Sequence, residues 1–126
     1  MKRVLDVGNC VPDHSAVTSF LTSRFDCEVL QADTADDALA KLRKVDVDLI
    51  LVNRKLDCDY SDGVEVIRRI KAEDKLANIP VMLITNYADH QETAMAIGAV
   101  RGFGKLEYGK PETLERLQPI LGQRQD

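Results

Sequence analysis

Short apolar runs alternate with segments of helical periodicity along the whole chain. In the segments between the runs, apolar side chains recur three and four positions apart, as in Ala16, Val17, Phe20 and Leu21. This spacing is typical of amphipathic helices, whereas runs of three to five apolar residues favour buried strands. The pattern therefore predicts five strands alternating with five helices. The strands are expected at residues 4–7, 28–30, 49–52, 81–84 and 100–103.

Residues that begin or end helices fall where this pattern requires them. Thr34 with Asp37 forms an acidic variant of the capping box before the second helix. Gly98 suits the end of the fourth helix, and Pro111 suits the first turn of the fifth. Pro119 should end or bend that last helix, because proline lacks a backbone donor.

Strands and helices that alternate with short connections imply parallel strands and right-handed crossovers. We therefore expect an open α/β sandwich, with helices on both faces of one sheet. In such sheets, ligands and chemistry gather outside the carboxyl ends of the strands. The candidate functional residues are the polar and small residues that follow the strands: Gly8, Asn9, Cys10, Asn53, Thr85, Asn86 and Lys105.

Composition narrows the class of protein. We expect the 126 residues to form one domain, with its core in residues 2–122 and a short tail at 123–126. A formal net charge of −4 argues against nucleic acid as a partner. No apolar segment is long enough for a membrane span or a secretory leader, so we expect a cytoplasmic protein without membrane contact.

Three long stretches resemble the receiver domain of bacterial two-component response regulators. They are DLILVNRKL at 48–56, DGVEVIRRIKAEDKLANIPVMLIT at 62–85 and GAVRGFGK at 98–105, and the likeness covers residues 2–122. The resemblance implies a flavodoxin-like (βα)5 three-layer sandwich with a parallel sheet of order 2-1-3-4-5. It also implies signalling: a histidine kinase phosphorylates an aspartate that ends the third strand, beside Mg²⁺ held by that aspartate and an acidic pair.

The residues at the matching positions depart from the family pattern. Asn53 stands at the phosphoacceptor position, and Gly8 and Asn9 stand at the acidic pair. Thr85 and Lys105 match the hydroxyl residue and the lysine that bind the phosphoryl oxygens in the family. An amide oxygen is a poor nucleophile, and Mg²⁺ depends on carboxylates. We therefore expect no acyl phosphate at Asn53, and neither a metal nor a cofactor.

Carboxylates near the site leave two alternatives open. Asp6 could join the acidic pair if the first strand slid in register, although the slide would turn neighbouring side chains to the wrong faces. Asp57 or Asp59, in the loop after Asn53, could serve as a moved phosphoacceptor. Aspartates in loops are more often solvated turn residues.

The switch of the family is also altered. Its aromatic residue corresponds to Gly102, which has no side chain to rotate, and the adjacent Phe103 should pack in the core because side chains alternate along a strand. Leu106 follows Lys105 where the family has a proline after a cis peptide, so we expect a trans peptide here.

In the family, carboxylates in the pocket balance the charge of the lysine. This sequence lacks them at the matching positions, so the ammonium group of Lys105 needs another partner. It should bond the carbonyl of Asn53 or pair with one of the loop acids Asp57, Asp59 and Asp62. Alternatively, Lys105 and Thr85 could bind an anion or a small acidic metabolite.

Cysteines and histidines give little evidence of a second site. Cys10, Cys58, His14 and Asp57 could be drawn together as a soft-metal or redox site, but their spacing matches no common zinc pattern. We expect unpaired thiols at Cys10 and Cys58. His90 is most simply a surface residue.

The sequence thus predicts a pseudo-receiver: a stand-alone module that binds proteins without phosphorylation and is not an enzyme. The resemblance places its docking face on the fourth helix, fifth strand and fifth helix, around Arg101, Phe103, Glu107 and Tyr108. The expected partner is another signalling protein or a second copy of the chain. The alternatives are a small-molecule or anion sensor that uses Lys105 and Thr85, and a phosphorylatable receiver with its acceptor moved to Asp57 or Asp59.

Overall fold

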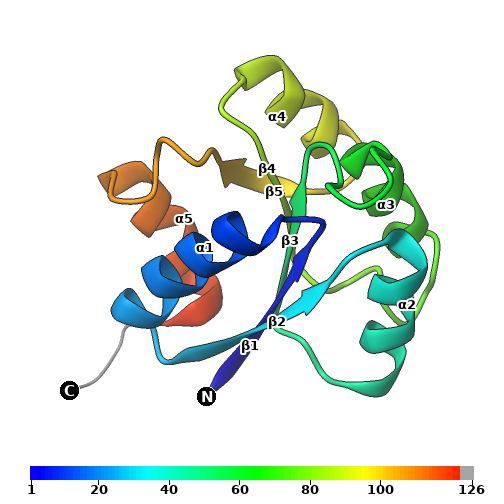
Figure 1. Ribbon diagram of the computed structural model, residues 1–126, viewed down its shortest axis with the longest axis horizontal. Helices are drawn as coiled ribbons and strands as arrows, with labels where there is room; N and C mark the ends of the chain where they lie inside the picture. Colours follow the sequence, from blue (N-terminus) through cyan, green and yellow to red (C-terminus); the bar gives the residue numbers. More distant parts are fainter. Residues whose placement is uncertain (123–126) are drawn as a thin grey trace.

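The computed structural model describes residues 1–122 and has the predicted α/β architecture (Figure 1). Five parallel strands form one sheet in the order β2-β1-β3-β4-β5, which is the flavodoxin-like order. The predicted tail at 123–126 lies outside the described residues. The strands are β1 (Lys2–Val7), β2 (Cys27–Ala32), β3 (Leu49–Asn53), β4 (Val81–Ile84) and β5 (Val100–Phe103). The helices are α1 (Val11–Arg24), α2 (Ala35–Lys44), α3 (Gly63–Lys71), α4 (Ala88–Ala96) and α5 (Pro111–Leu121).

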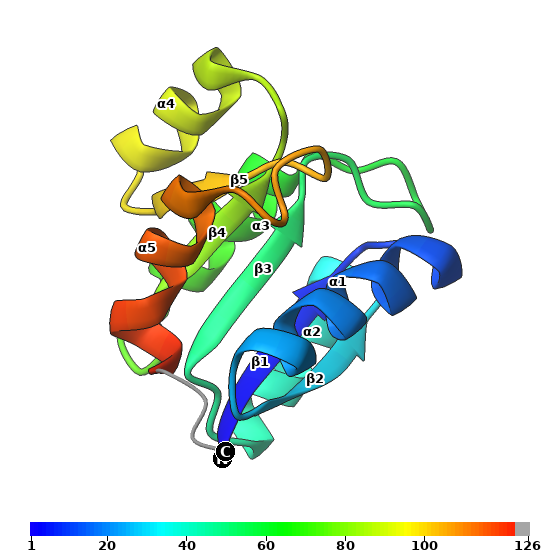
Figure 2. The same cartoon turned by 90° about the vertical axis from the view of Figure 1, so that its left-hand side faces the viewer.

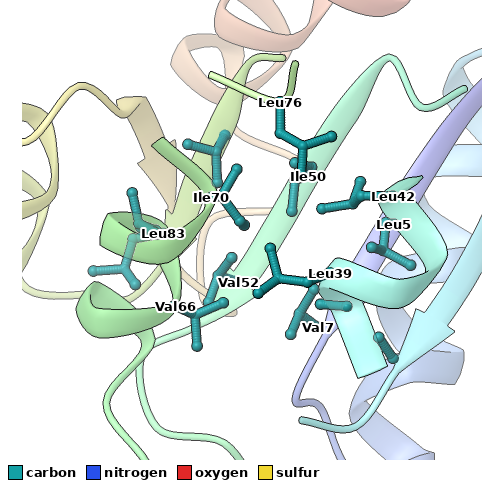
Figure 3. Close-up of a cluster of buried hydrophobic side chains, with 14 of the residues drawn as sticks. Leu5, Val7, Leu39, Leu42, Ile50, Val52, Val66, Ile70, Leu76 and Leu83 are labelled. Atoms are coloured by element: carbon teal, nitrogen blue, oxygen red, sulfur yellow. The ribbon is translucent and has the colours of Figure 1, made fainter. Parts of the chain in front are cut away.

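Side chains that alternate along the central strands supply one apolar cluster on each face of the sheet. Leu5 and Ile50 point toward α2, α3 and α4, where they pack in the larger cluster that Figure 3 shows. Val4 and Leu49 point toward α1 and α5 and belong to the second cluster. Figure 2 shows these two helices in front of the sheet. Because both faces are covered, the strands can be apolar throughout, as the sequence pattern indicated.

The predicted helix boundaries have physical causes in the structure. The hydroxyl oxygen of Thr34 accepts a hydrogen bond from the backbone N–H of Asp37 at 3.1 Å, so the predicted cap of α2 is confirmed. Gly98 follows α4 with a φ of +105°, a backbone conformation that favours glycine. Pro111 opens α5, and Pro119 lies inside its last turn, two residues before the helix ends at Leu121.

The peptide bond after Lys105 and the length of the helices can both be compared with the sequence analysis within residues 1–122. The peptide between Lys105 and Leu106 is trans, as expected, since residues 1–122 contain no cis peptide bond. Within the same range, no helix is long and apolar enough to cross a membrane.

Candidate functional site

The strand order brings the candidate residues to one edge of the sheet. β1 and β3 are neighbours at the centre, where the direction of strand succession reverses, and such a switch point is the usual ligand site of an open α/β sheet. Gly8 and Asn9 follow β1, Asn53 ends β3, Thr85 follows β4, and Lys105 lies two residues beyond β5. All five therefore lie at the carboxyl edge of the sheet.

Leu56 fills the space beside Gly8. The Leu56 side chain is fully buried, and a Cβ atom added to Gly8 would overlap its Cγ atom. Gly8 has a φ of +84°, and its carbonyl oxygen accepts a hydrogen bond of 2.8 Å from the backbone N–H of Asp57. The loop between β3 and α3 therefore folds back onto the end of β1, and the apolar side chain of Leu56 occupies the space that a side chain at position 8 would enter.

The Asn53 side chain is turned into its own loop. Its Nδ2 atom donates a hydrogen bond of 2.7 Å to the carbonyl oxygen of Lys55. The neighbouring loop acids also have local partners. Asp59 accepts hydrogen bonds from the backbone N–H and the hydroxyl of Ser61 at 3.0 and 2.6 Å, and these bonds lower the pKa of Asp59. Asp62 caps α3 by accepting a bond from the N–H of Val64 at 2.9 Å.

Asn9 joins a buried polar group that the sequence analysis missed. Its Nδ2 atom donates to Asp6 Oδ1 at 2.7 Å, and the Nδ1 atom of His14 lies 2.8 Å from Asp6 Oδ2. Asp6 is fully buried and Asn9 nearly so. Burial raises the pKa of Asp6, while the hydrogen bond and the charge of His14 act in the opposite direction with smaller effect. The signal in the sequence was an aspartate at an inward-facing strand position, followed by a histidine in the first helix.

The register of β1 places Asp6 within the strand, opposite Leu51 of β3. Its side chain points toward α1, the face on which Leu51 packs. The slid register that would bring Asp6 to the position of the acidic pair is therefore not formed.

Lys105 has a partner that the sequence analysis did not name. Its Nζ atom donates to Asp13 Oδ2 of α1 at 2.7 Å, and this hydrogen bond is the main cause of the lowered pKa of Asp13. The expected bond to Asn53 or to a loop acid is wrong. The physical reason is that Asp13 lies in the first turn of α1, over the carboxyl edge of the sheet, whereas the loop acids Asp59 and Asp62 are engaged locally.

Thr85 is held by His90. The Thr85 hydroxyl lies 3.1 Å from His90 Nδ1 and accepts a bond from the N–H of Tyr87 at 3.3 Å. On its other side, His90 Nε2 faces the Nε–H of Arg54 at 3.2 Å. An arginine Nε–H can only donate, so His90 Nε2 accepts, and the imidazole proton lies on Nδ1 and points to Thr85. His90 is half-buried and links two loops, which corrects its reading as a simple surface residue.

The expected docking face needs one correction. Phe103 is fully buried and packs edge to face against Phe20 and Tyr108, with ring centroids 6.1 and 5.9 Å apart. Its prediction as a core residue is confirmed, and its inclusion in the exposed face is wrong, because its side chain points inward under α1 and α5. Arg101, Glu107 and Tyr108 are partly exposed.

Among residues 1–122 the structure contains no disulfide and no group of three side chains placed to hold a metal ion. Cys10 is instead hydrogen-bonded to Asp13, and Cys58 is exposed in the loop before α3. The structure thus does not bring the cysteines, His14 and Asp57 together into one site.

The sheet order, and a polar site at its switch point, define a flavodoxin-like protein. The family description "Response regulator receiver domain" matches residues 10–118, which is most of the chain. The protein therefore belongs to the response regulator receiver domain family, the signalling module of two-component systems. Among curated proteins, none matches the chain significantly.

Solved structures share this fold. A putative response regulator from Chloroflexus aurantiacus superimposes with a TM-score of 0.82 at 18% identity, over 97% of this chain and 98% of the other. The chemotaxis protein CheY4 of Vibrio cholerae gives 0.74 at 25% identity, over 96% and 99%. The receiver domain of the sensor histidine kinase PA1611 from Pseudomonas aeruginosa, which has a magnesium ion in its active-site cleft, gives 0.77 at 19%, over 97% and 98%.

Proposed function

We propose that this protein is a pseudo-receiver, a receiver domain that binds a partner protein without accepting a phosphoryl group. The observation that carries the proposal is at Asn53, which ends β3 at the phosphoacceptor position and turns its amide into its own loop. The amide carries no net charge, so its oxygen lacks the nucleophilic strength of a carboxylate oxygen, which shares a full negative charge.

The residues present do not fit the Mg²⁺ ion of the family. Mg²⁺ needs oxygen ligands in octahedral geometry, usually including carboxylates. Gly8 offers no side chain, and Leu56 fills the space beside it. Asn9 directs its Nδ2 toward the buried Asp6, and Asn53 directs its Nδ2 toward Lys55. This donor set supports the loss of metal-dependent phosphotransfer.

The retained family residues are engaged elsewhere. Lys105 pairs with Asp13 and Thr85 with His90, so the two side chains that would bind a phosphoryl group or another anion already have partners. These contacts weigh against an anion sensor at this place. The hydrogen bonds of Asp59 to Ser61 weigh against Asp59 as a moved phosphoacceptor. Asp57 is exposed in the same loop, and mass spectrometry tests directly whether it accepts a phosphoryl group.

The proposed docking face lies on α4, β5 and α5. Without Phe103 it comprises the partly exposed Arg101, Glu107 and Tyr108, together with Val100, whose side chain is exposed on the edge strand. An edge strand and its flanking helices offer both apolar surface and charge to a partner. The proposed partner is another signalling protein or a second copy of the chain.

The first test is intact-mass spectrometry with acetyl phosphate and Mg²⁺. We expect no added phosphoryl mass and no Mg²⁺-dependent rise in melting temperature. A single phosphoryl adduct on the wild-type chain would refute the proposal, and fragment masses would then show whether Asp57 or Asp59 carries it. A phosphorylatable receiver domain treated in the same way is the positive control.

The second test addresses the docking face. Sedimentation equilibrium of the wild type, of Val100→Asp with Arg101→Glu, and of Asn53→Ala measures self-association. If the partner is a second copy, the paired surface changes should abolish association and Asn53→Ala should leave it unchanged. Association that persists in the surface variant and is lost in Asn53→Ala would contradict the proposed face.

A further inference from the structure

Gln91 of α4 is a polar side chain enclosed between a helix and the sheet. Its side chain is 4% exposed, and both ends of its amide are hydrogen-bonded to the backbone. Nε2 donates to the carbonyl oxygens of Leu83 and Thr85 at 2.9 and 3.3 Å, and Oε1 accepts from the backbone N–H of Gly102 at 2.8 Å. One side chain thus bonds α4 to β4, to the residue after β4 and to β5.

The bonds of Gln91 fall at an irregularity between β4 and β5. Met82 is paired with Val100 and Ile84 with Phe103, so two steps along β4 are matched by three steps along β5. An extra residue in one strand leaves backbone groups without ladder partners. Leu83 O and Gly102 N lie within this stretch, and the Gln91 amide bonds both. The side chain therefore replaces a missing piece of the backbone ladder.

Gly102 is held from both flanking helices. A Cβ atom at this position would overlap the carbonyl oxygen of Leu83, so the close approach of the two strands requires glycine. While the N–H of Gly102 donates to Gln91 of α4, its carbonyl oxygen accepts a bond of 3.0 Å from Arg116 Nη1 of α5. α4, β5 and α5 are consequently joined through the backbone of one residue.

We infer that the bonds of Gln91 and Arg116 to Gly102, here termed the Gln91 clasp, hold α4, β5 and α5 in one arrangement, so that the α4, β5 and α5 face is always presented in the same form. This inference rests on the proposed function and extends it to regulation: the face needs no signal to form. A switching domain requires two packings of similar free energy. Moving α4 away from β5 leaves the buried Leu83 carbonyl and Gly102 N–H unbonded, which penalises any second packing.

The clasp can be tested by hydrogen exchange at the Gly102 amide, measured by NMR. Gln91→Met keeps the length of the side chain and removes its hydrogen bonds. We expect the Gly102 amide to exchange about tenfold faster in this variant, the effect of losing one net hydrogen bond of ordinary strength. Gln118→Met, an identical change at an exposed glutamine of α5, is the matched control and should leave the rate unchanged. An equal rate in Gln91→Met and wild type would overturn the inference.

A measurement on the wild type keeps the test decisive if Gln91→Met does not fold. Relaxation dispersion across residues 85–103 should be flat, because one packing is populated. Dispersion there, with no phosphoryl adduct in the mass measurement, would overturn the clasp and leave the proposed function standing. A phosphoryl adduct with flat dispersion would instead remove the proposed function and leave the clasp as a constraint on the face.

Discussion

The carboxylate of Asp6 and the imidazole of His14 lie 2.8 Å apart at the end of β1, and the Asp6 side chain has no exposed surface. Asn9 Nδ2 donates a hydrogen bond to the other carboxylate oxygen of Asp6. The positive charge of Lys105 also acts to lower the pKa of Asp6. Burial nevertheless outweighs these favourable contacts and raises the pKa of Asp6 above its ordinary value of 3.8. The ionised form of Asp6 is therefore less stable in the folded protein than in the unfolded chain.

Asp6→Asn should raise the free energy of unfolding at pH 7. In the wild type, the penalty for ionised Asp6 is fully present above its folded-state pKa and is relieved as the pH falls through that value toward 3.8. Asparagine can keep hydrogen bonds to Asn9 and His14 without the charge. Thermal melts from pH 7 to pH 4 should show the advantage of the variant shrinking as the pH falls. The exposed Asp26→Asn serves as control, and a gap that widens toward pH 4 would contradict the assignment.

The pair of Lys105 and Asp13 should contribute little to stability. Its side chains are 32% and 40% exposed, and exposed ion pairs contribute about 0.2–1 kcal/mol. A double-mutant cycle with Lys105→Ala and Asp13→Ala, followed by urea unfolding, measures the coupling. We expect a value in this range that decreases in high salt, because mobile ions screen partly exposed charges. A salt-independent coupling above about 3 kcal/mol would indicate a tightly coupled buried pair instead.

The fold could be predicted because local pattern and global packing agree. The run Leu49 to Val52 is apolar at every position, as a strand covered on both faces must be, and Thr34 bonds the N–H that its sequence spacing indicated. The alternation of strands and helices then leaves few topologies. The same reasoning predicted that the candidate residues lie together at the carboxyl edge of the sheet, and the strand order and strand ends place them there.

Contacts inside the site could not be predicted, because they join segments that are far apart in the sequence. Lys105 and Asp13 are separated by 92 positions, and several other acids were equally plausible partners. Glutamine in a helix usually faces solvent, but Gln91 is buried. Its burial depends on the irregular pairing of β5 with β4, which no local sequence pattern reveals. Phe103 was assigned both to the core and to the docking face, and strand alternation alone gave the correct answer.

Gly102→Ala should destabilise the protein. The added Cβ atom would overlap the Leu83 carbonyl oxygen, and overpacking of a closely packed position costs about 1–3 kcal/mol. Gly109→Ala is the matched control. A Cβ atom at position 109 meets no atom within 4 Å, so this change should be neutral or slightly stabilising. Urea denaturation compares the two variants, and equal stabilities would show that β4 and β5 can separate at Gly102 without penalty.

Asn53→Asp alone should not restore phosphorylation. The change supplies a carboxylate at the end of β3, but Gly8 and Asn9 still provide no acidic pair for Mg²⁺. We expect no phosphoryl adduct after incubation with acetyl phosphate and Mg²⁺, and no Mg²⁺-dependent rise in melting temperature. The measurement is intact-mass spectrometry beside the wild type, and an adduct at position 53 would show that the remaining residues suffice.

Gly8→Asp tests whether the Leu56 side chain excludes a carboxylate from position 8. A side chain at position 8 must adopt a φ of +84° and overlap Leu56, two effects that each cost about 1–3 kcal/mol. Leu56→Ala removes the overlap but leaves a cavity, and such core truncations cost about 2–5 kcal/mol. If Leu56 blocks the position, the double variant should lose less unfolding free energy than the two single variants lose together. The difference should be about 1–3 kcal/mol, measured by urea unfolding. Additive losses would mean that Gly8 is required by backbone conformation alone, and that Leu56 is not what excludes a carboxylate from the end of β1.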